Sequence, residues 1–411
     1  MVTTALTEFL SSPGWELLQS LQARPDIEYA DRERLGAALR RNGIDASTAA
    51  ALLTQLDLRD HATSKFGEFA HQMVFTRDGL EQSTRMVVAA LHAQRFRTGG
   101  ATRVADLGCG IGGDALAMAG LGLGVVAVDI DEDAAAAAAV NLRAFPEAVV
   151  VRADVTTLDL PALVDEGVDA LFADPARRSG AGRGNTRMLG PESWSPPLST
   201  VLSWREHVER LGVKMAPGVP HTALPADCHV QWTSVDGDLV EAALWTPALA
   251  PEGPGRSALV IRHGHAHALG DPDTPTPDAP VRAAPVRDLG AFVAEPDPAV
   301  IRAGLVARLA DDLGAHLVSP GIAWLSADSI APTPFASRFE VVDVVALRAP
   351  AISKALAGLG VGRVEVKKRG ADIDPAALRR SLKLVGEGEA TVIATRIAGR
   401  HRAIIARRCN N

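Results

Sequence analysis

The sequence predicts an α/β protein with a mostly parallel sheet, preceded by a helical N-terminal prefix and followed by a small α/β C-terminal module. Two observations predict the sheet. From Arg103 onward, short apolar runs alternate with helical patterns, as in parallel strands joined by crossover helices. Over residues 230–245 the period changes to two alternating runs around Asp236-Gly237, which favours an antiparallel hairpin that closes the sheet.

The first 96 residues are predicted to be helical. Arg32–Arg41 has an amphipathic pattern that ends at Asn42-Gly43, a frequent helix stop. Asp45 can cap the next helix with its carboxylate. Asp78-Gly79-Leu80-Glu81 resembles the capping box of a later helix.

Five strands are expected before the hairpin, and they cover residues 103–106, 125–129, 149–154, 168–174 and 213–216. Helices are expected between them, including an alanine-rich one at Asp133–Phe145 and one at Val201–Leu211 before the fifth strand. Because the strands are parallel, their carboxyl ends meet at one edge of the sheet, where such sheets bind ligands.

Composition shifts then divide the chain. Two stretches rich in Pro, Asp and Ala, Thr246–Gly255 and Asp271–Pro285, are expected to be loops or linkers. Asp297–Leu313 has a helical pattern, and residues 339–408 predict strand, helix, strand, helix and two strands. The predicted regions are a helical part at 1–96, the sheet domain at 97–265, a linker and helical connector at 266–337, and a basic module at 338–411.

Bulk composition excludes several classes. A chain of 411 residues suggests more than one domain, and no apolar run is long enough to cross a bilayer. The first ten residues lack a signal-peptide pattern. Only three cysteines occur (Cys109, Cys228 and Cys409), which argues against a disulfide framework. We therefore expect a cytoplasmic protein without a membrane partner, and the composition predicts no particular oligomeric state.

Charge is distributed unevenly. The whole chain carries −7, but residues 363–408 hold twelve Lys or Arg against five Asp or Glu, a local +7 that leaves −14 for the rest. This asymmetry suggests a polyanion site on the C-terminal part alone. A solvated basic face without a ligand explains the charge equally well.

A glycine-rich loop follows the first strand, in Asp106-Leu107-Gly108-Cys109-Gly110-Ile111-Gly112-Gly113. Glycines allow a sharp turn and close approach of the backbone to a ligand. Gly108, Gly110 and Gly113 also satisfy the dinucleotide fingerprint, so the glycines alone leave NAD and S-adenosylmethionine open.

Three carboxylates favour S-adenosylmethionine. Asp106 can face the ammonium group of a methionine moiety, whereas it would repel a pyrophosphate. Asp129 ends the second strand and can accept from ribose hydroxyls. Asp154 ends the third strand and can accept from an adenine amino group. Taken singly, each of them could instead be a helix cap.

With these motifs the chain resembles the class I methyltransferases, with their Rossmann-like sheet, over about residues 60–262. The resemblance implies that Asp106, Gly108 and Gly110 hold the methionine end of S-adenosylmethionine, Asp129 the ribose and Asp154 the adenine. Gly112 is counted with these cofactor-binding residues.

The fourth strand ends in Asp174-Pro175-Ala176-Arg177. Amino-methylating relatives have Asp or Asn, two prolines and an aromatic residue here, with which they orient a target amine and stack its base. Asp174, Pro175 and Arg177 are therefore the candidate catalytic residues, with the arginine plane in place of the missing ring. The arginine-rich loop that follows, with Arg183 and Arg187, could contact phosphates or be merely solvated.

The C-terminal module resembles the THUMP-like domain fused to bacterial methyltransferases, on Arg338–Asp343 and Gly362–Gly370. Because THUMP domains bind RNA, the resemblance implies an RNA substrate. The candidate RNA-binding residues are Lys367, Lys368, Arg369, Arg379 and Arg380.

We therefore predict an S-adenosylmethionine-dependent methyltransferase that acts on a base nitrogen of RNA, either tRNA or rRNA. Two alternatives remain: a small-molecule or protein methyltransferase with a dimerising tail, and a non-catalytic RNA-binding protein that retains the cofactor pocket. No metal is expected, because His263, His265 and His267 lack a fourth ligand at usable spacing. No cysteine is placed as the nucleophile that carbon methylation of a pyrimidine needs.

Overall fold

The computed structural model describes residues 6–22, 32–177 and 190–409. The chain divides into two compact units, one of residues 1–215 and 243–253, the other of residues 216–242 and 254–411. Each unit is therefore made of two stretches of chain. Of the residues that follow the fifth strand, 216–242 and 254–265 belong to the second unit, and 243–253 belong to the first.

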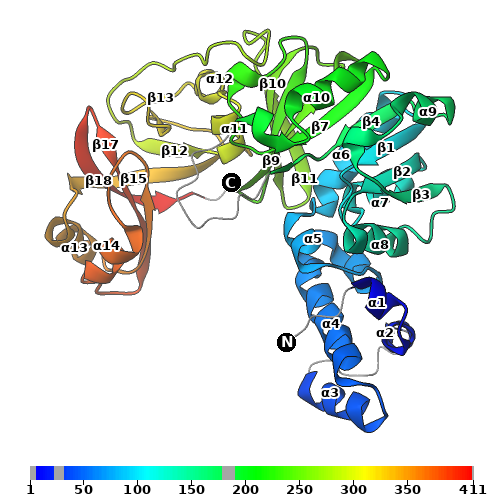
Figure 1. Ribbon diagram of the computed structural model, residues 1–411. Helices are drawn as coiled ribbons and strands as arrows, with labels where there is room; N and C mark the ends of the chain where they lie inside the picture. Colours follow the sequence, from blue (N-terminus) through cyan, green and yellow to red (C-terminus); the bar gives the residue numbers. More distant parts are fainter. Residues whose placement is uncertain (1–5, 23–31, 178–189, 410–411) are drawn as a thin grey trace. The chain divides into compact units, whose positions relative to one another are not determined.

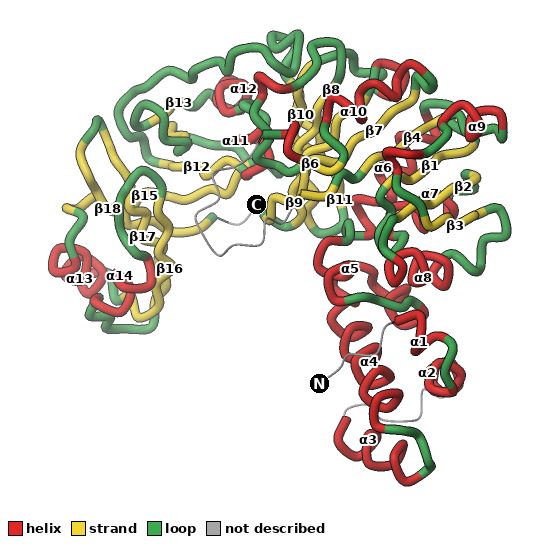
Figure 2. Tube along the Cα trace, viewed as in Figure 1, coloured by secondary structure: helices red, strands yellow, loops and turns green. Residues whose placement is uncertain are grey.

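The first unit begins with helices (Figure 2). They are α1 (Leu6–Leu10), α2 (Pro13–Gln22), α3 (Arg32–Arg41), α4 (Ala46–Phe66), the 3-10 helix η1 (Gly67–Gln72), α5 (Arg77–Gln82) and α6 (Met86–Thr98). Asp45 caps α4 by accepting from the backbone N–H groups of Ser47 and Thr48, as the sequence predicts. The capping box at Asp78 is wrong, because the Thr76 hydroxyl accepts from Gly79 N–H at 3.0 Å and caps α5 instead.

A parallel sheet follows, in the order β7-β4-β1-β2-β3 (Figure 1). Its strands are β1 (Arg103–Leu107), β2 (Gly124–Asp129), β3 (Ala148–Arg152), β4 (Ala170–Ala173) and β7 (Arg210–Met215). The helices after them are α7 (Gly113–Gly120), α8 (Glu132–Asn141), α9 (Leu160–Asp165) and α10 (Leu198–Ser203), with the 3-10 turns η2 (Val155–Thr157), η3 (Pro191–Ser193) and η4 (Trp204–Glu206). A two-stranded ribbon, β5 (Ala176–Arg177) with β6 (Trp194–Ser195), lies after β4.

The predicted strands and their parallel arrangement are confirmed, but the predicted helix at Val201–Leu211 is wrong in its second half. Arg210–Met215 is strand β7, which pairs in register with β4. Leu211 and Val213 are fully buried in this strand, and Gly212 lies so close to Trp245 that a Cβ would approach the indole ring to 2.5 Å. Pairing and burial at this point outweigh local helical pattern.

The second unit contains the predicted hairpin. Strands β8 (His229–Val235) and β9 (Asp238–Trp245) are neighbours joined at Asp236-Gly237, both with positive φ, and β9 continues into the first unit. Strand β8 pairs in parallel with β10 (Gly255–Arg262), which pairs antiparallel with β11 (His265–Gly270). Residues His265 and His267 therefore lie in a strand. The 3-10 turn η5 (His221–Ala223) precedes β8, and the 3-10 turn η6 (Pro247–Leu249) follows β9 in the first unit.

The remaining residues build a second sheet in the order β13-β14-β12-β15-β18-β17-β16. Its strands are β12 (Phe292–Pro296), β13 (His316–Leu317), β14 (Leu325–Ala327), β15 (Ala336–Ala346), β16 (Val361–Lys368), β17 (Gly388–Ile397) and β18 (Arg400–Arg408). The helices are α11 (Pro298–Arg302), α12 (Val306–Asp312), α13 (Ala349–Gly358) and α14 (Pro375–Ser381). The predicted order of elements in the C-terminal module is confirmed. The expected helix at Asp297–Leu313 is two helices, separated at Gly304, whose φ is +72°.

Candidate active site

The glycine loop between β1 and α7 is shaped by three left-handed residues. Gly108, Gly110 and Gly112 have φ values of +89°, +55° and +80°, which residues with a side chain adopt only with strain. A Cβ on Gly108 would lie 2.8 Å from the Asp174 carbonyl oxygen, so the loop passes directly against the end of β4. A Cβ on Gly110 would meet nothing within 4 Å. The loop therefore packs closely against the end of β4 at Gly108 and leaves free space beside Gly110.

Replacing Gly108 by alanine should lower the free energy of unfolding by roughly 2–4 kcal/mol, because strain and overlap with the Asp174 carbonyl add up. Gly110→Ala, which is strained but not crowded, should cost only about 1–2 kcal/mol. Urea denaturation of both variants measures the difference. Equal losses would show that the close approach between this loop and β4 is not what requires glycine.

Asp106, the penultimate residue of β1, is a buried carboxyl with an unsatisfied oxygen. The residue is 1% exposed, and its Oδ2 has no hydrogen-bond partner among the described residues. Burial raises its pKa well above the usual value, with further increases from Asp114 and Asp174, while Lys214 opposes the shift. A buried carboxylate oxygen without a donor suits a cationic ligand group. The residue therefore fits the ammonium of a methionine moiety.

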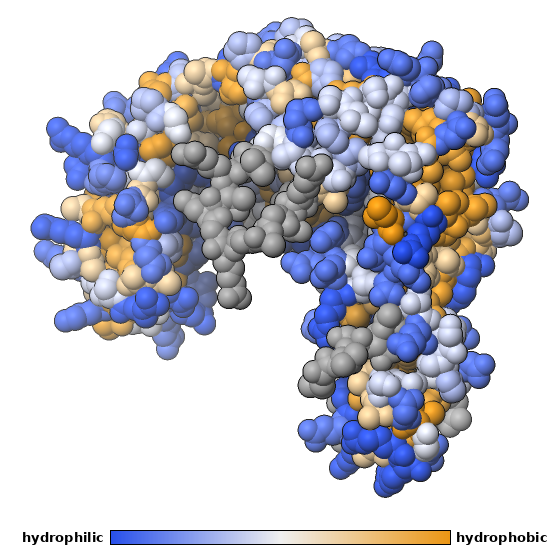
Figure 3. All heavy atoms as spheres, viewed as in Figure 1, coloured by the Kyte–Doolittle hydropathy of each residue, from blue (hydrophilic) through white to orange (hydrophobic). Residues whose placement is uncertain are grey.

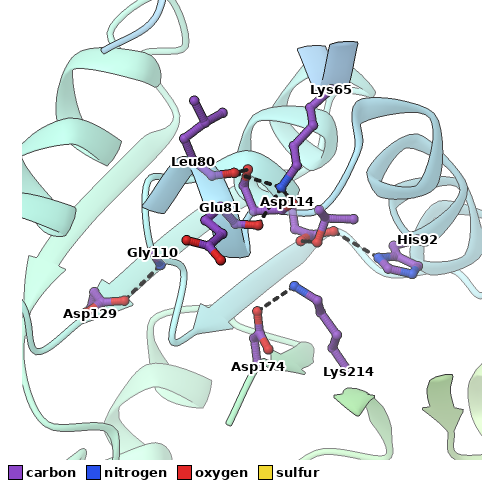
Figure 4. A network of polar contacts seen from close by, with 11 residues as sticks. Lys65, Leu80, Glu81, His92, Gly110, Asp114, Asp129, Asp174 and Lys214 are labelled. Atoms are coloured by element: carbon purple, nitrogen blue, oxygen red, sulfur yellow. Dashed lines mark hydrogen bonds and ion pairs between the residues drawn. The ribbon is translucent and has the colours of Figure 1, made fainter. Parts of the chain in front are cut away.

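Asp129, at the end of β2, is engaged with the backbone. Its Oδ2 accepts from Gly110 N–H at 2.8 Å and its Oδ1 from Asp131 N–H at 2.9 Å. The first bond holds the glycine loop against β2 (Figure 4). The next residue, Ile130, is 63% exposed. An apolar side chain exposed beside this carboxylate suits contact with a flat ring, a feature that the sequence analysis missed.

Asp154 is a cap in the structure. Its Oδ1 accepts from Thr156 N–H at 2.9 Å and from the Thr156 hydroxyl at 2.7 Å, and these bonds hold its pKa below the usual value. The carboxylate lies just beyond the end of β3, where the sequence analysis expects an adenine contact. The capping alternative is therefore realised, and both bonds to Thr156 involve Oδ1 rather than Oδ2.

Asp174 forms an ion pair that the sequence analysis missed. Its Oδ2 lies 2.7 Å from the Nζ of Lys214 on β7 (Figure 4). The two side chains are 35% and 14% exposed, so the pair is partly removed from water. The next residue, Pro175, is buried. The backbone of Arg177 pairs with Trp194 in the β5–β6 ribbon, and Arg183 and Arg187 lie outside the described residues.

A second polar contact, between a carboxylate and a histidine ring, is buried next to the loop. The Asp114 carboxylate, in the first turn of α7, lies 2.9 Å from Nδ1 of His92 and accepts from the Thr84 hydroxyl at 2.6 Å. These contacts lower the pKa of Asp114 despite its burial. Lys65 on α4 donates to the carbonyl oxygens of Leu80, Glu81 and Ser83, and burial together with Lys214 lowers its pKa. Figure 4 shows these groups converging near the loop.

Cys109 lies in the glycine loop and is buried. Burial raises the pKa of the Cys109 thiol, as do Asp106 and Asp129, so it is held as a thiol rather than a nucleophilic thiolate. The described ranges contain no group of three or more His, Cys, Asp or Glu that could hold a metal ion. They also contain no helix long and apolar enough to span a membrane.

The five candidate RNA-binding residues differ in the partners that they have within the described chain. Lys367 and Arg369 both face Glu295 of β12, at 2.8 and 3.7 Å, while Lys368 donates to the Ile373 carbonyl oxygen at 2.7 Å. Arg379 and Arg380, in the last turn of α14, are exposed, and neither forms an ion pair within the described chain. The two arginines are thus the more available cations.

Arg379 and Arg380 border a hollow of about 590 Å³ between α14 and the edge strand β16. Apolar residues Val364, Val366 and Leu384 line it together with Glu365, and Figure 3 shows apolar and polar side chains mixed over the region of α13 and α14. Arg408 and Lys367 pair with Glu365 and help to lower its pKa. The hollow combines apolar walls with two exposed guanidinium groups.

Three family profiles match the chain. One described as "Methyltransferase small domain" covers residues 67–184, which contain the glycine loop and the end of β4. One described as "THUMP domain-like" covers residues 336–408. A domain of unknown function (DUF8688) covers residues 3–62.

Whole-chain relatives agree with these matches. Two proteins of Mycobacterium tuberculosis, from strains CDC 1551 / Oshkosh and ATCC 25618 / H37Rv, are each 34% identical over 350 residues, which cover 83% of this chain and 90% of theirs. Both are described as uncharacterized S-adenosylmethionine-dependent methyltransferases. A crystal structure described as that of a methyltransferase from Porphyromonas gingivalis W83 has a TM-score of 0.74 at 17% identity and covers 96% of this chain and 99% of its own. At that identity the likeness concerns the fold.

Proposed function

We propose that this chain, which belongs to the S-adenosylmethionine-dependent methyltransferase family, transfers the methyl group of this cofactor to a base nitrogen of RNA. The observation that carries the proposal is the position of Asp174. Its carboxylate follows β4 directly, and its backbone carbonyl borders Gly108 of the glycine loop. A carboxylate at that point can orient a nitrogen nucleophile and accept its proton.

The cofactor-binding residues are assigned on the same geometry. Asp106 would hold the ammonium of the methionine moiety, Gly108 and Gly110 would let the backbone approach it, and Asp129 would reach the ribose while it braces Gly110. Gly112, at the left-handed N-cap of α7, continues this loop. Asp154 and Ile130 would flank the adenine. When bound, S-adenosylmethionine supplies the electrophilic methyl group of a sulfonium.

RNA is favoured over a small molecule or a protein by the C-terminal module. It matches a THUMP domain-like profile, and residues 363–408 carry a net +7 on an otherwise acidic chain. Among the predicted RNA-binding residues, Arg379 and Arg380 would contribute most, since Lys367 and Arg369 already face Glu295. Guanidinium groups beside apolar walls suit phosphates and stacked bases.

Methyl transfer tests the proposal directly. Purified full-length protein is incubated with methyl-labelled S-adenosylmethionine and total RNA from cells that lack the protein. We expect the label to be incorporated into RNA, so that treatment with ribonuclease releases the label and treatment with proteinase does not. Label found only in protein or in small molecules would favour a protein or small-molecule methyltransferase with a dimerising tail. Binding of RNA without methyl transfer would favour a non-catalytic RNA-binding protein.

Charge reversal of the two arginines provides a quantitative prediction. Arg379→Glu with Arg380→Glu should weaken RNA binding and flatten the dependence of log affinity on log salt by roughly one to two units, since each lost phosphate contact removes about 0.7–0.9. Fluorescence anisotropy at several salt concentrations measures both.

The matched control is Arg40→Glu with Arg41→Glu. These are also two adjacent exposed arginines in the last turn of a helix, α3, so the change in charge and in helix-end electrostatics is the same. The control should keep the wild-type salt slope. Equal losses in both double variants would indicate a non-specific charge effect instead of a site on the C-terminal module.

A further inference from the structure

The ion pair between Lys214 and Asp174 is built by the sheet itself. Strands β4 and β7 are parallel neighbours in which Ala173 lies opposite Val213. Asp174 and Lys214 are the next residues along the chain from each, so both side chains reach the carboxyl edge at the same level. Their contact of 2.7 Å therefore follows from register rather than from chance meeting of long surface side chains.

Lys214 differs from the other lysine of this cluster in its partner. Lys65 also lies nearby, but its ammonium donates to three backbone carbonyl oxygens around the end of α5. Lys214 instead meets the carboxylate assigned to the substrate, and its side chain is only 14% exposed. Its charge is felt by Asp106, Asp114 and Lys65, since it shifts the pKa of each. An ammonium has three hydrogens and a carboxylate has about four acceptor sites, so the pair can engage a ligand while their mutual contact stays formed.

We propose that Lys214 and Asp174 together recognise a lactam edge, a ring N–H beside a carbonyl, so that the methylated atom is N1 of guanine or N3 of uracil. This inference rests on the proposed function. Asp174 accepts the ring N–H, and the Lys214 ammonium donates to the neighbouring carbonyl oxygen.

The transfer step balances with these two residues. The ring proton passes to the Asp174 carboxylate, and the nitrogen electron pair forms the new N–C bond. The S–C bond of the sulfonium breaks with its electron pair left on sulfur. Negative charge that develops on the base as the proton leaves is shared with the carbonyl oxygen, where the Lys214 ammonium stabilises it.

The sign of the charge distinguishes a lactam from an exocyclic amine. When an amino group of adenine or cytosine attacks, positive charge develops on the base, and an adjacent ammonium opposes it. When a lactam nitrogen loses its proton, the charge that develops is negative, and the same ammonium favours it more in the transition state than in the ground state. A lysine held against Asp174 therefore favours a lactam nitrogen over an exocyclic amine as the methylated atom.

The identity of the methylated nucleoside tests this with the wild-type chain. RNA labelled as above is digested to nucleosides and separated by liquid chromatography and mass spectrometry. Label in N1-methylguanosine or in N3-methyluridine is expected and also tells the two bases apart. Label in N6-methyladenosine, N4-methylcytidine or N2-methylguanosine overturns the lactam assignment but keeps RNA methylation, whereas unlabelled RNA overturns the proposed function itself.

Substitution of Lys214 gives a second, independent readout. Lys214→Met keeps the length of the side chain and removes its charge, so kcat at pH 7 should fall about 10²–10³-fold, as on loss of one oxyanion donor. The deficit should shrink as pH rises, because the ring N–H then ionises without help. Lys214→Arg keeps the charge and should retain more of the rate. A deficit in Lys214→Met that is the same at every pH would mean that the lysine only holds Asp174 in place, and would overturn its proposed contact with the substrate.

Discussion

Asp106→Asn should weaken S-adenosylhomocysteine binding by roughly 3–5 kcal/mol, about 10²- to 10³-fold or more, because a buried charged pair loses one partner. The ligand ammonium would then face an amide that carries no charge. Titration calorimetry measures the affinity. Asp165→Asn removes the same charge from an exposed position at the end of α9 and should bind like the wild type.

The same substitution should stabilise the ligand-free protein. Burial raises the pKa of Asp106 in the folded state, so its contribution to stability is fully present below the unfolded pKa near 4 and is lost as pH rises through the folded pKa. The amide that replaces this carboxyl cannot ionise. The variant should therefore match the wild type near pH 4 and exceed it by roughly 1–3 kcal/mol at pH 7.

Denaturation at several pH values measures this gain. A variant that loses cofactor affinity and also loses stability at neutral pH would contradict the assignment of Asp106 as a buried carboxylate kept for a ligand. A variant that binds the cofactor normally would place the ammonium elsewhere. Both results are readable without any RNA substrate.

Asp174→Ala should reduce kcat about 10²–10⁴-fold, the range expected for loss of a positioned proton acceptor. Affinity for S-adenosylhomocysteine should change little, because this carboxylate is assigned to the acceptor and not to the cofactor. Single-turnover transfer to RNA, with calorimetry beside it, measures both quantities.

Asp174→Asn is the informative companion. The amide still accepts a hydrogen bond from the target N–H but is a poor base, so its kcat should lie between that of the wild type and that of the alanine variant. Because Lys214 loses its charged partner in both variants, a thermal melt of each checks that the fold is intact. Unchanged turnover in Asp174→Ala would remove the residue from the mechanism.

Sequence patterns predicted best the features whose causes are local. The helix Arg32–Arg41, the Asp45 cap and the Asp236-Gly237 turn all depend on residues within a few positions of one another, and the structure contains each. The glycine loop belongs to the same class, since positive φ at Gly108 and Gly110 is a property of those residues.

Features that depend on distant pairing could not be predicted in this way. The start of strand β7, residues 210–211, was expected to be helical, and it is a strand because β4 offers it a partner in register, 40 residues earlier in the chain. The Lys214–Asp174 contact arises from the same pairing. One signal was available, a lysine within the otherwise apolar run Leu211–Met215. A charged residue at such a position is expected to have a specific partner.

Ion pairing also decided which basic residues remain available for RNA. Lys367, Lys368 and Arg369 are consecutive in the sequence. Glu295, about seventy residues earlier, forms ion pairs with Lys367 and Arg369. Local charge counts cannot detect such a partner. Arg379 and Arg380 remain the main candidates for RNA contact because both side chains are exposed.

The most direct test of RNA base methylation compares the modified nucleosides of total RNA from cells with and without this protein. We expect one methylated nucleoside to disappear when the protein is absent, and to return when the wild-type chain is restored but not when Asp174→Ala is. An identical set of modified nucleosides in all these cells would contradict the account.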